Sequence, residues 1–149
     1  MQINTTNLTQ ARKQIQELKK QKKPIIVQAQ NTEFNRKILE NKDVDVLLSP
    51  ELHNRKDRLK QRDSGLNEIL CKIATKNNIK IGVNIKEIQK LSKKQKAIIL
   101  ARIKQNIQLC KRTKTQIIFI PILKKQEILS FLKVLGANPQ QASFAYQKK

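Results

Sequence analysis

Short apolar runs alternate with amphipathic helical patterns along the whole sequence, and this alternation constrains the fold more than any other feature. Four apolar runs predict strands: residues 25–30, 44–49, 79–85 and 115 to about 121. Because helical patterns separate successive strands, the strands should run parallel in one sheet. The runs are continuously apolar, as expected for a sheet that is covered by helices.

The helical patterns bury one face each. The clearest has apolar side chains at the spacing i, i+3, i+4, i+7 and i+8, at Leu66, Ile69, Leu70, Ile73 and Ala74. Similar stripes are predicted by Leu8, Ala11, Ile15 and Leu18, and by Ile99, Ile103, Ile107 and Cys110. Ser92 with Gln95 predicts a capping box, Gly136 a helix C-terminus, and Asn138 a final N-cap.

We therefore expect a single α/β domain over residues 1–149, with a parallel sheet of about four strands and covering helices. Four strands in 149 residues are too few for a complete eight-stranded β/α barrel, which takes roughly 250 residues. An open sheet or part of a TIM-like barrel is expected.

The charge of the chain points to a polyanionic partner. It has 32 Lys and Arg against 11 Asp and Glu, a formal net charge of +21. Such a charge opposes compaction unless a polyanion neutralises it, which favours nucleic acid over an anionic membrane surface. With one Tyr, four Phe and no Trp, base stacking on exposed aromatics is poorly supported. Binding to structured RNA through phosphates and shape fits better.

The cysteines and the N-terminus favour a soluble, cytoplasmic protein. Cys71 and Cys110 are far apart in sequence, do not form a metal-type pair, and fall at apolar positions of helical patterns. They are therefore expected to be small buried hydrophobes. The start "MQINTTNLTQ" is polar, unlike a signal peptide, and no apolar run approaches the length of a membrane span.

The most informative segment is the basic loop at residues 50–65, between the second predicted strand and the helix that follows. In a parallel sheet this loop lies at the carboxyl ends of the strands, where ligands bind. It is unusually long for such a connection, and long loops are often functional. Its candidate RNA-binding residues are Arg55, Lys56, Arg58, Lys60, Arg62, Asp63, Ser64 and Gly65.

Each residue of "RDSG" has a predicted role in a phosphate cradle. Arg62 would contact a phosphate through two N–H groups, and Asp63 would orient that arginine. Ser64 would cap a helix beginning near Gly65 or Leu66. Gly65 would leave room for a phosphate at the helix N-terminus. The alternative is a solvated loop with an ordinary cap. The basic clusters at 19–23 and 90–96 are solvated faces or further RNA contacts.

The same residues resemble a known family. The strand "VDVLLSP" followed by "RDSGLNEILCKIATKNNIKIGVNI" is similar to the most distinctive segment of the ribonuclease P protein component 3 family, found in archaea and eukaryotes. The matching positions are Ser49, Pro50, Arg62, Asp63, Ser64, Gly65, Asn77 and Asn78. The resemblance continues through "TQIIFIPI" and returns in "VLGANPQQASFAY", covering roughly residues 25–146. Family members begin with about three more strand–helix units, so the resemblance implies a truncated TIM-like barrel of the polymerase-and-histidinol-phosphatase (PHP) type.

The resemblance implies a non-catalytic protein subunit of a ribonucleoprotein enzyme. In ribonuclease P the RNA subunit removes the 5′ leader of precursor tRNA with Mg²⁺. Component 3 supports that RNA together with a smaller protein subunit. The implied partners are therefore the ribonuclease P RNA, precursor tRNA and the small partner protein, with no cofactor or metal bound by this chain.

Two alternatives remain open from the residues. One is a generic basic protein that binds structured RNA. The other is a metal-dependent phosphoesterase of the PHP type, to which the family's barrel is similar. The second is disfavoured because such metal sites need several His and carboxylate ligands on one face. The single histidine, His53, is expected to be a surface residue of the basic loop. Asp43 and Asp45 are expected at the opposite end of their strand.

Overall fold

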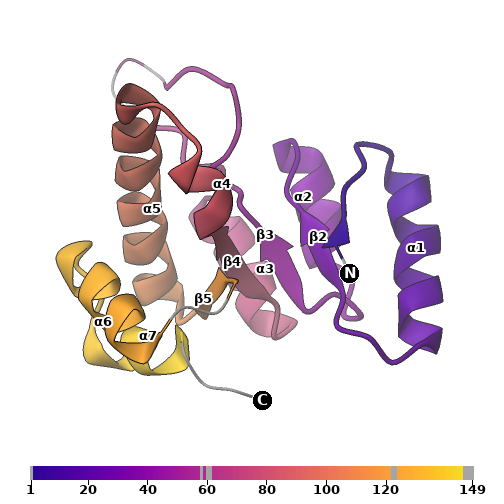
Figure 1. Cartoon of the computed structure of the whole chain (residues 1–149). Helices are drawn as coiled ribbons and strands as arrows, with labels where there is room; N and C mark the ends of the chain where they lie inside the picture. Colours follow the sequence, from indigo (N-terminus) through magenta and orange to yellow (C-terminus); the bar gives the residue numbers. More distant parts are fainter. Residues whose placement is uncertain (1, 58, 60–61, 122–123, 146–149) are drawn as a thin grey trace.

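The computed structural model describes residues 2–57, 59, 62–121 and 124–145 (Figure 1). Within this part of the chain, a 5-stranded parallel sheet has the order β1-β2-β3-β4-β5, so every strand lies next to its neighbour in sequence. The strands are β1 (Gln2–Ile3), β2 (Ile26–Gln28), β3 (Val46–Leu48), β4 (Lys80–Asn84) and β5 (Ile117–Ile120). The α/β architecture predicted from the alternation is confirmed.

The prediction of about four strands missed β1. Gln2 and Ile3 pair with Ile26 and Val27 of β2. Two residues in a polar N-terminal segment form no apolar run, so the sequence pattern did not reveal them. Ile3 is only 2% exposed, because it packs in the common core.

Helices follow or precede each strand. They are α1 (Leu8–Lys20), α2 (Thr32–Leu39), α3 (Glu68–Lys76), α4 (Ile85–Gln89), α5 (Lys93–Thr113), α6 (Lys125–Val134) and α7 (Pro139–Ala145). The capping box of Ser92 and Gln95 is present at α5, and Asn138 accepts a hydrogen bond from the Gln141 N–H at 2.8 Å. The short helix α4 was not predicted. It begins where the fourth strand ends, because the Asn84 side chain accepts from the Glu87 N–H.

The main core lies between one face of the sheet and the helices. A row of side chains from neighbouring strands is in register across this face: Val27, Leu47, Ile81 and Ile117. All four are at most 3% exposed and pack in the cluster that includes the buried stripes of α1 and α5. Cys71 and Cys110 are buried free thiols in that core, as predicted.

On the other face of the sheet, side chains of β3 pack closely over Gly82. A Cβ atom at Gly82 would lie 2.8 Å from Val46 Cγ1 and 2.9 Å from Leu48 Cδ1. These side chains therefore close over the glycine, as in the interior of a barrel, where inward side chains fill the space. Five parallel strands in sequence order are consistent with part of a TIM-like barrel.

Parallel strands place functional loops at one edge. The β3–α3 connection and the segment between α4 and α5 both lie at the carboxyl-terminal edge, beside the first turns of α5 (Figure 1). The cluster at 19–23 spans the last turn of α1 and the turn before β2, so it lies at the opposite edge. The topology thus brings one of the two additional basic clusters next to the basic loop and separates the other from it.

Candidate nucleic-acid interface

The candidate interface is the connection between β3 and α3, residues 49–67. It begins with Ser49, which has a positive φ of 52°. The Ser49 N–H donates to the Gly82 carbonyl at 2.7 Å, and its hydroxyl accepts from the Asn84 N–H at 3.2 Å. The loop is therefore fixed to β4 at its first residue, and the matched Ser49 has a structural role.

Arg102 of α5 organises the first half of the loop. Its guanidinium donates to the carbonyls of Glu51, His53 and Arg55 at 2.8–3.1 Å, and to Asp57 Oδ1 at 3.2 Å. Arg102 is 4% exposed, so these bonds lie in a largely water-excluded site. A planar fork with five donors suits such convergence of acceptors. The loop backbone thus takes its shape around one buried cation.

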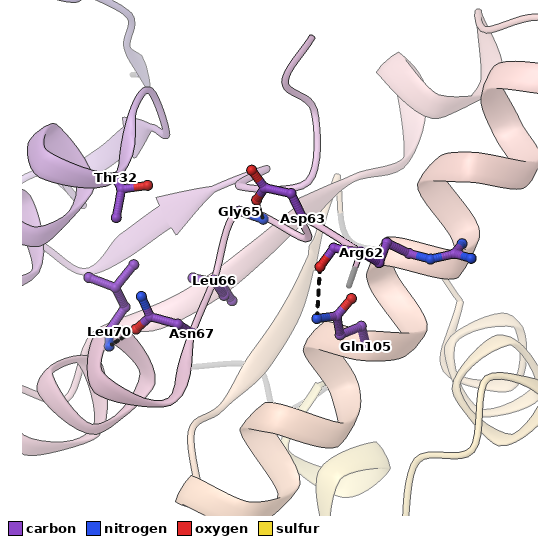
Figure 2. A pocket seen from close by; sticks show the side chains of 8 residues that line it. All are labelled: Thr32, Arg62, Asp63, Gly65, Leu66, Asn67, Leu70 and Gln105. Atoms are coloured by element: carbon purple, nitrogen blue, oxygen red, sulfur yellow. Dashed lines mark hydrogen bonds between the residues drawn. The ribbon is translucent and has the colours of Figure 1, made fainter. Parts of the chain in front are cut away.

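The second half of the loop is held by the same helix. Asn106 Nδ2 donates to the Ser64 carbonyl at 3.1 Å, and Gln105 Nε2 donates to the Arg62 carbonyl at 3.2 Å (Figure 2). Neither Arg102 nor Asn106 was predicted from the sequence. Both are in register with the apolar stripe of α5, three residues after Ile99 and Ile103, and a polar residue on a buried stripe was the signal that could have identified them.

Asp63 binds Arg55, which corrects the predicted pairing with Arg62. Arg55 Nε lies 2.8 Å from Asp63 Oδ2, and Arg55 Nη2 lies 3.3 Å from Oδ1. The hydrogen bond from Arg55 lowers the pKa of Asp63 to about 2. Arg62 points away from Asp63 in Figure 2, and its nearest carboxylate is Asp57 at 4.0 Å. The sequence suggested the adjacent arginine, but adjacent side chains in an extended loop point in different directions.

The predicted cap by Ser64 is wrong. The helix begins at Glu68, and the N-cap is Asn67, whose Oδ1 accepts from the Leu70 N–H at 2.9 Å. Ser64 is 1% exposed, and its hydroxyl donates to the Leu66 carbonyl. The helix predicted from the apolar spacing also began too early. Leu66 precedes the observed helix, and Ile69, expected on the buried face, is 64% exposed.

Gly65 packs against the loop itself. It has a φ of +78°, which disfavours other residues, and a Cβ there would lie 1.8 Å from the Pro50 carbonyl oxygen. The glycine therefore permits the close approach of residues 50 and 65 at the base of the loop. This is a different reason for glycine than the predicted room for a phosphate.

Glu51 is buried in the loop and the His53 side chain is largely covered, whereas His53 was expected at the surface. The His53 side chain is 10% exposed, and its Nε2 lies 2.9 Å from the Asp63 carbonyl. Burial, with Arg102 and Arg55 nearby, lowers the pKa of His53. Glu51 is 0% exposed, and its carboxylate oxygens have no hydrogen-bond partner among the described residues. Burial raises the pKa of Glu51 to about 8, so a neutral carboxylic acid lies beneath the loop.

The outer surface of the loop presents cations beside a small depression of about 240 Å³ (Figure 2). Arg62, which is 44% exposed, lines the depression with Asn67 and Gln105. Lys56 is exposed and Arg55 is partly exposed. Arg58 and Lys60 lie outside the described residues. Because Glu68 lies in the first turn of α3, its carboxylate offsets the positive end of the helix; it also pairs with Lys72 at 2.7 Å.

The carboxylates and the histidine do not converge on a metal. Over residues 2–57, 59, 62–121 and 124–145, no group of three or more His, Cys, Asp or Glu side chains is placed to hold a metal ion. Asp43 pairs with Lys19 at 2.7 Å, and Asp45 accepts from the Ile25 N–H at 2.8 Å, before β3 begins. Among the described helices, none is both long and apolar enough to cross a membrane.

Known proteins with similar sequences agree with the resemblance drawn from the motifs. No protein-family model matches the chain. Ribonuclease P protein component 3 of Methanococcus maripaludis is 26% identical over 118 residues, which cover 79% of this chain and 48% of that protein. The chain is similar in sequence to ribonuclease P protein component 3. The proteins of the same name from Methanosarcina mazei and Methanocaldococcus jannaschii are each 25% identical, over 125 and 112 residues.

Solved structures support the fold. A chain in a cryo-EM structure of archaeal ribonuclease P with mature tRNA superposes with a TM-score of 0.79 at 23% identity, covering 95% of this chain and 61% of that one. A crystal structure of an uncharacterized protein superposes with a TM-score of 0.58 at 9% identity. The resemblance suggested by the sequence motifs is therefore confirmed. The chain spans about half the length of the curated relatives it matches.

Proposed function

We propose that this chain is a protein subunit of ribonuclease P, which binds the catalytic RNA and supports removal of the 5′ leader from precursor tRNA. The observation that carries the proposal is the sequence similarity to component 3 proteins, whose matched region includes the basic loop. The net charge of +21 supports it, because an RNA polyanion would neutralise the repulsion within the chain.

The RNA contacts proposed here are the cations of the loop. Arg62 and Lys56 offer N–H donors at the surface, and Arg58 and Lys60 are proposed with them on sequence grounds. Arg55 would contribute through the donors that Asp63 leaves free. Asp63, Ser64 and Gly65 would act indirectly, since their side chains or backbone maintain the loop.

The chemistry belongs to the RNA in this proposal. The RNA subunit would use Mg²⁺ for hydrolysis, and the chain would bind neither metal nor cofactor. A smaller protein subunit of the same particle is the proposed protein partner, and the cytoplasm is the proposed location. The RNA-binding loop would act by phosphate contacts that position and stabilise the catalytic RNA.

Reconstitution tests the proposal. Adding the chain to a cognate ribonuclease P RNA and the small partner protein should lower the Mg²⁺ concentration needed for leader cleavage. The chain alone should cleave no precursor tRNA. Nuclease activity that survives removal of all RNA and follows the chain through purification would support the phosphoesterase alternative.

A generic structured-RNA-binding protein is the second candidate, favoured by the charge and by a loop that presents cations without a base-stacking aromatic. The two candidates differ in selectivity. A ribonuclease P subunit should bind ribonuclease P RNA more tightly than an unrelated folded RNA of equal length, whereas a generic binder should bind both equally.

A further inference from the structure

A second depression lies on the other side of the loop, between residues 52–54 and the α4–α5 segment. Its volume is about 360 Å³, at the small end of the roughly 300–1,000 Å³ typical of small-molecule sites. Apolar side chains form much of its wall: Leu52, Leu91, Ile98 and Ile99. The proposed phosphate contacts make no use of this depression.

Several polar groups of the lining have unused hydrogen-bonding capacity. Asn54 is exposed, and among the described residues its side-chain amide has no partner. Gln95 accepts from the Ser92 N–H through Oε1, which leaves its NH₂ group unpaired within the same part of the chain. Glu87 binds Lys90 through one oxygen at 2.7 Å. Donors and acceptors around an apolar wall suit a planar heterocycle with hydrogen-bonding edges.

The rim carries two lysines and the Glu87 carboxylate, so its net charge is positive. Lys90 lies at the rim, because it pairs with the lining residue Glu87. Lys94 is exposed one helical turn before Ile98, so the two share a side of α5. The 21 residues of α5 include no Asp or Glu. This charge favours an anionic occupant over the apolar side chain of a protein partner.

We propose that this depression binds one unpaired nucleobase of the bound RNA, with the adjoining phosphates on Lys90 and Lys94. Unpaired bases present their edges to protein side chains, which is how most sequence-specific RNA contacts are made. The base would lie against Ile98 and Leu91 and reach Asn54 and Gln95 by hydrogen bonds. This inference rests on the proposed RNA-binding function and adds base recognition to it.

The most direct test is a substitution that fills the depression. Ile98→Trp places a bulky side chain at its wall, and because Ile98 is 38% exposed the indole can be accommodated without disturbing the core. Ile69→Trp is the matched control, since Ile69 is 64% exposed on α3 and does not line this depression. The affinity for a ribonuclease P RNA transcript should fall about tenfold for Ile98→Trp, at the low end of the loss for one stacked base, and less than about twofold for the control.

Two further measurements separate a lost base contact from other effects. The salt dependence of affinity should stay the same in both variants, because no phosphate contact is removed. Titration with each of the four nucleoside monophosphates, followed by NMR, should shift the signals of Asn54, Gln95 and Ile98 selectively for one base. Asn54→Ala should reduce that selectivity, and as an exposed substitution it should not affect folding.

The outcomes distinguish the base site from the general function. Wild-type protein that binds the transcript with salt-dependent affinity, but loses no affinity on Ile98→Trp, overturns the base site alone. Equal losses in Ile98→Trp and Ile69→Trp do the same, as does a protein partner displaced by Ile98→Trp at unchanged RNA affinity. Wild-type protein that binds no transcript overturns both proposals.

Discussion

At the residue scale, the basic loop divides into groups that face outward and groups that maintain its shape. Arg62 and Arg102 are both arginines of the interface, yet one is 44% exposed and the other is 4% exposed. Asp63 and Glu51 are both acids of the loop, but an arginine lowers the pKa of the first and burial raises that of the second. The same residue type therefore has opposite roles according to its surroundings.

Arg62→Ala and Arg102→Ala should separate binding from folding. Arg62→Ala should change the free energy of unfolding by less than about 0.5 kcal/mol, as at an ordinary surface site, while weakening RNA binding. Arg102→Ala should lower the free energy of unfolding by about 3 kcal/mol, because buried acceptors of the loop lose their donor. Urea unfolding and RNA titration of the two variants check this. A stable Arg102→Ala protein would refute the organising role of that side chain.

Glu51→Gln should remove a pH dependence of stability. The pKa of Glu51 is about 8 in the folded state against an ordinary 4.5, so the folded state holds a proton that the unfolded state releases. Stability is therefore lost as pH rises through this window, by an amount on the order of a few kcal/mol. Glutamine resembles the protonated acid, so the variant should be the more stable protein at about pH 8.

Urea unfolding of the wild type and of Glu51→Gln between about pH 5 and pH 9 isolates this effect, because the loss falls between the two pKa values of Glu51 and ends near pH 8. The pKa of His53 is lowered from its ordinary value of 6.5. Below that pH the unfolded state binds the proton more readily, which reduces stability. Asp63, with a pKa of about 2, contributes stability that is lost only in acid. Identical pH profiles for the wild type and Glu51→Gln would show that Glu51 is ionised in the folded protein.

At the element scale, α5 connects the core to the interface. Ile99, Ile103 and Ile107 bury its apolar stripe, and the polar residues beside them bind the loop backbone. One helix therefore supplies both packing and loop geometry. The loop does not need regular structure of its own, because its carbonyls find donors on a rigid element.

The start of α3 gives a prediction at this scale. Asn67→Ala should lower the free energy of unfolding by about 1 kcal/mol, since the N-cap bond to Leu70 is lost. Ser64→Ala should cost less, because the Ser64 hydroxyl makes only a long bond of 3.4 Å to the Leu66 carbonyl. Equal slopes in urea denaturation would confirm comparable unfolded states. A larger loss of unfolding free energy for Ser64→Ala than for Asn67→Ala would support Ser64 as the cap, as predicted from the sequence.

At the scale of the whole molecule, charge and topology act together. The net charge of +21 is spread over both edges of the sheet, but the parallel order places residues 90–96 beside the loop and residues 19–23 at the opposite edge. A polyanion bound at the carboxyl-terminal edge would contact only the first cluster. The two clusters therefore provide a matched comparison.

Neutralising three lysines at each edge tests which edge of the sheet faces the bound RNA. Replacing Lys93, Lys94 and Lys96 with Gln should weaken RNA binding and flatten the plot of log affinity against log salt by about 2 units, because fewer counterions are released. Replacing Lys20, Lys22 and Lys23 with Gln should leave the slope within about half a unit of the wild type. Filter binding over a range of salt concentrations measures both. Equal slopes for the two triple variants would show non-directional binding.

The sequence alone determined the α/β class, the parallel sheet, the buried stripe of α5 and the family resemblance. Each depends on local periodicity or on an ordered motif, and both can be read without knowing which distant residues meet. The burial of Cys71 and Cys110 and the capping box at Ser92 belong to the same group, because register within one helix decides them.

Only the tertiary structure decided the roles of the residues in the loop. The partner of Asp63 is Arg55 rather than its neighbour Arg62, and Gly65 is required by the Pro50 carbonyl. Arg102 lies far along the chain from the carbonyls it binds. An irregular loop has no period from which side-chain directions can be inferred, and its shape is set by donors from another element. Those long-range contacts exist only once β3, β4 and α5 have packed together.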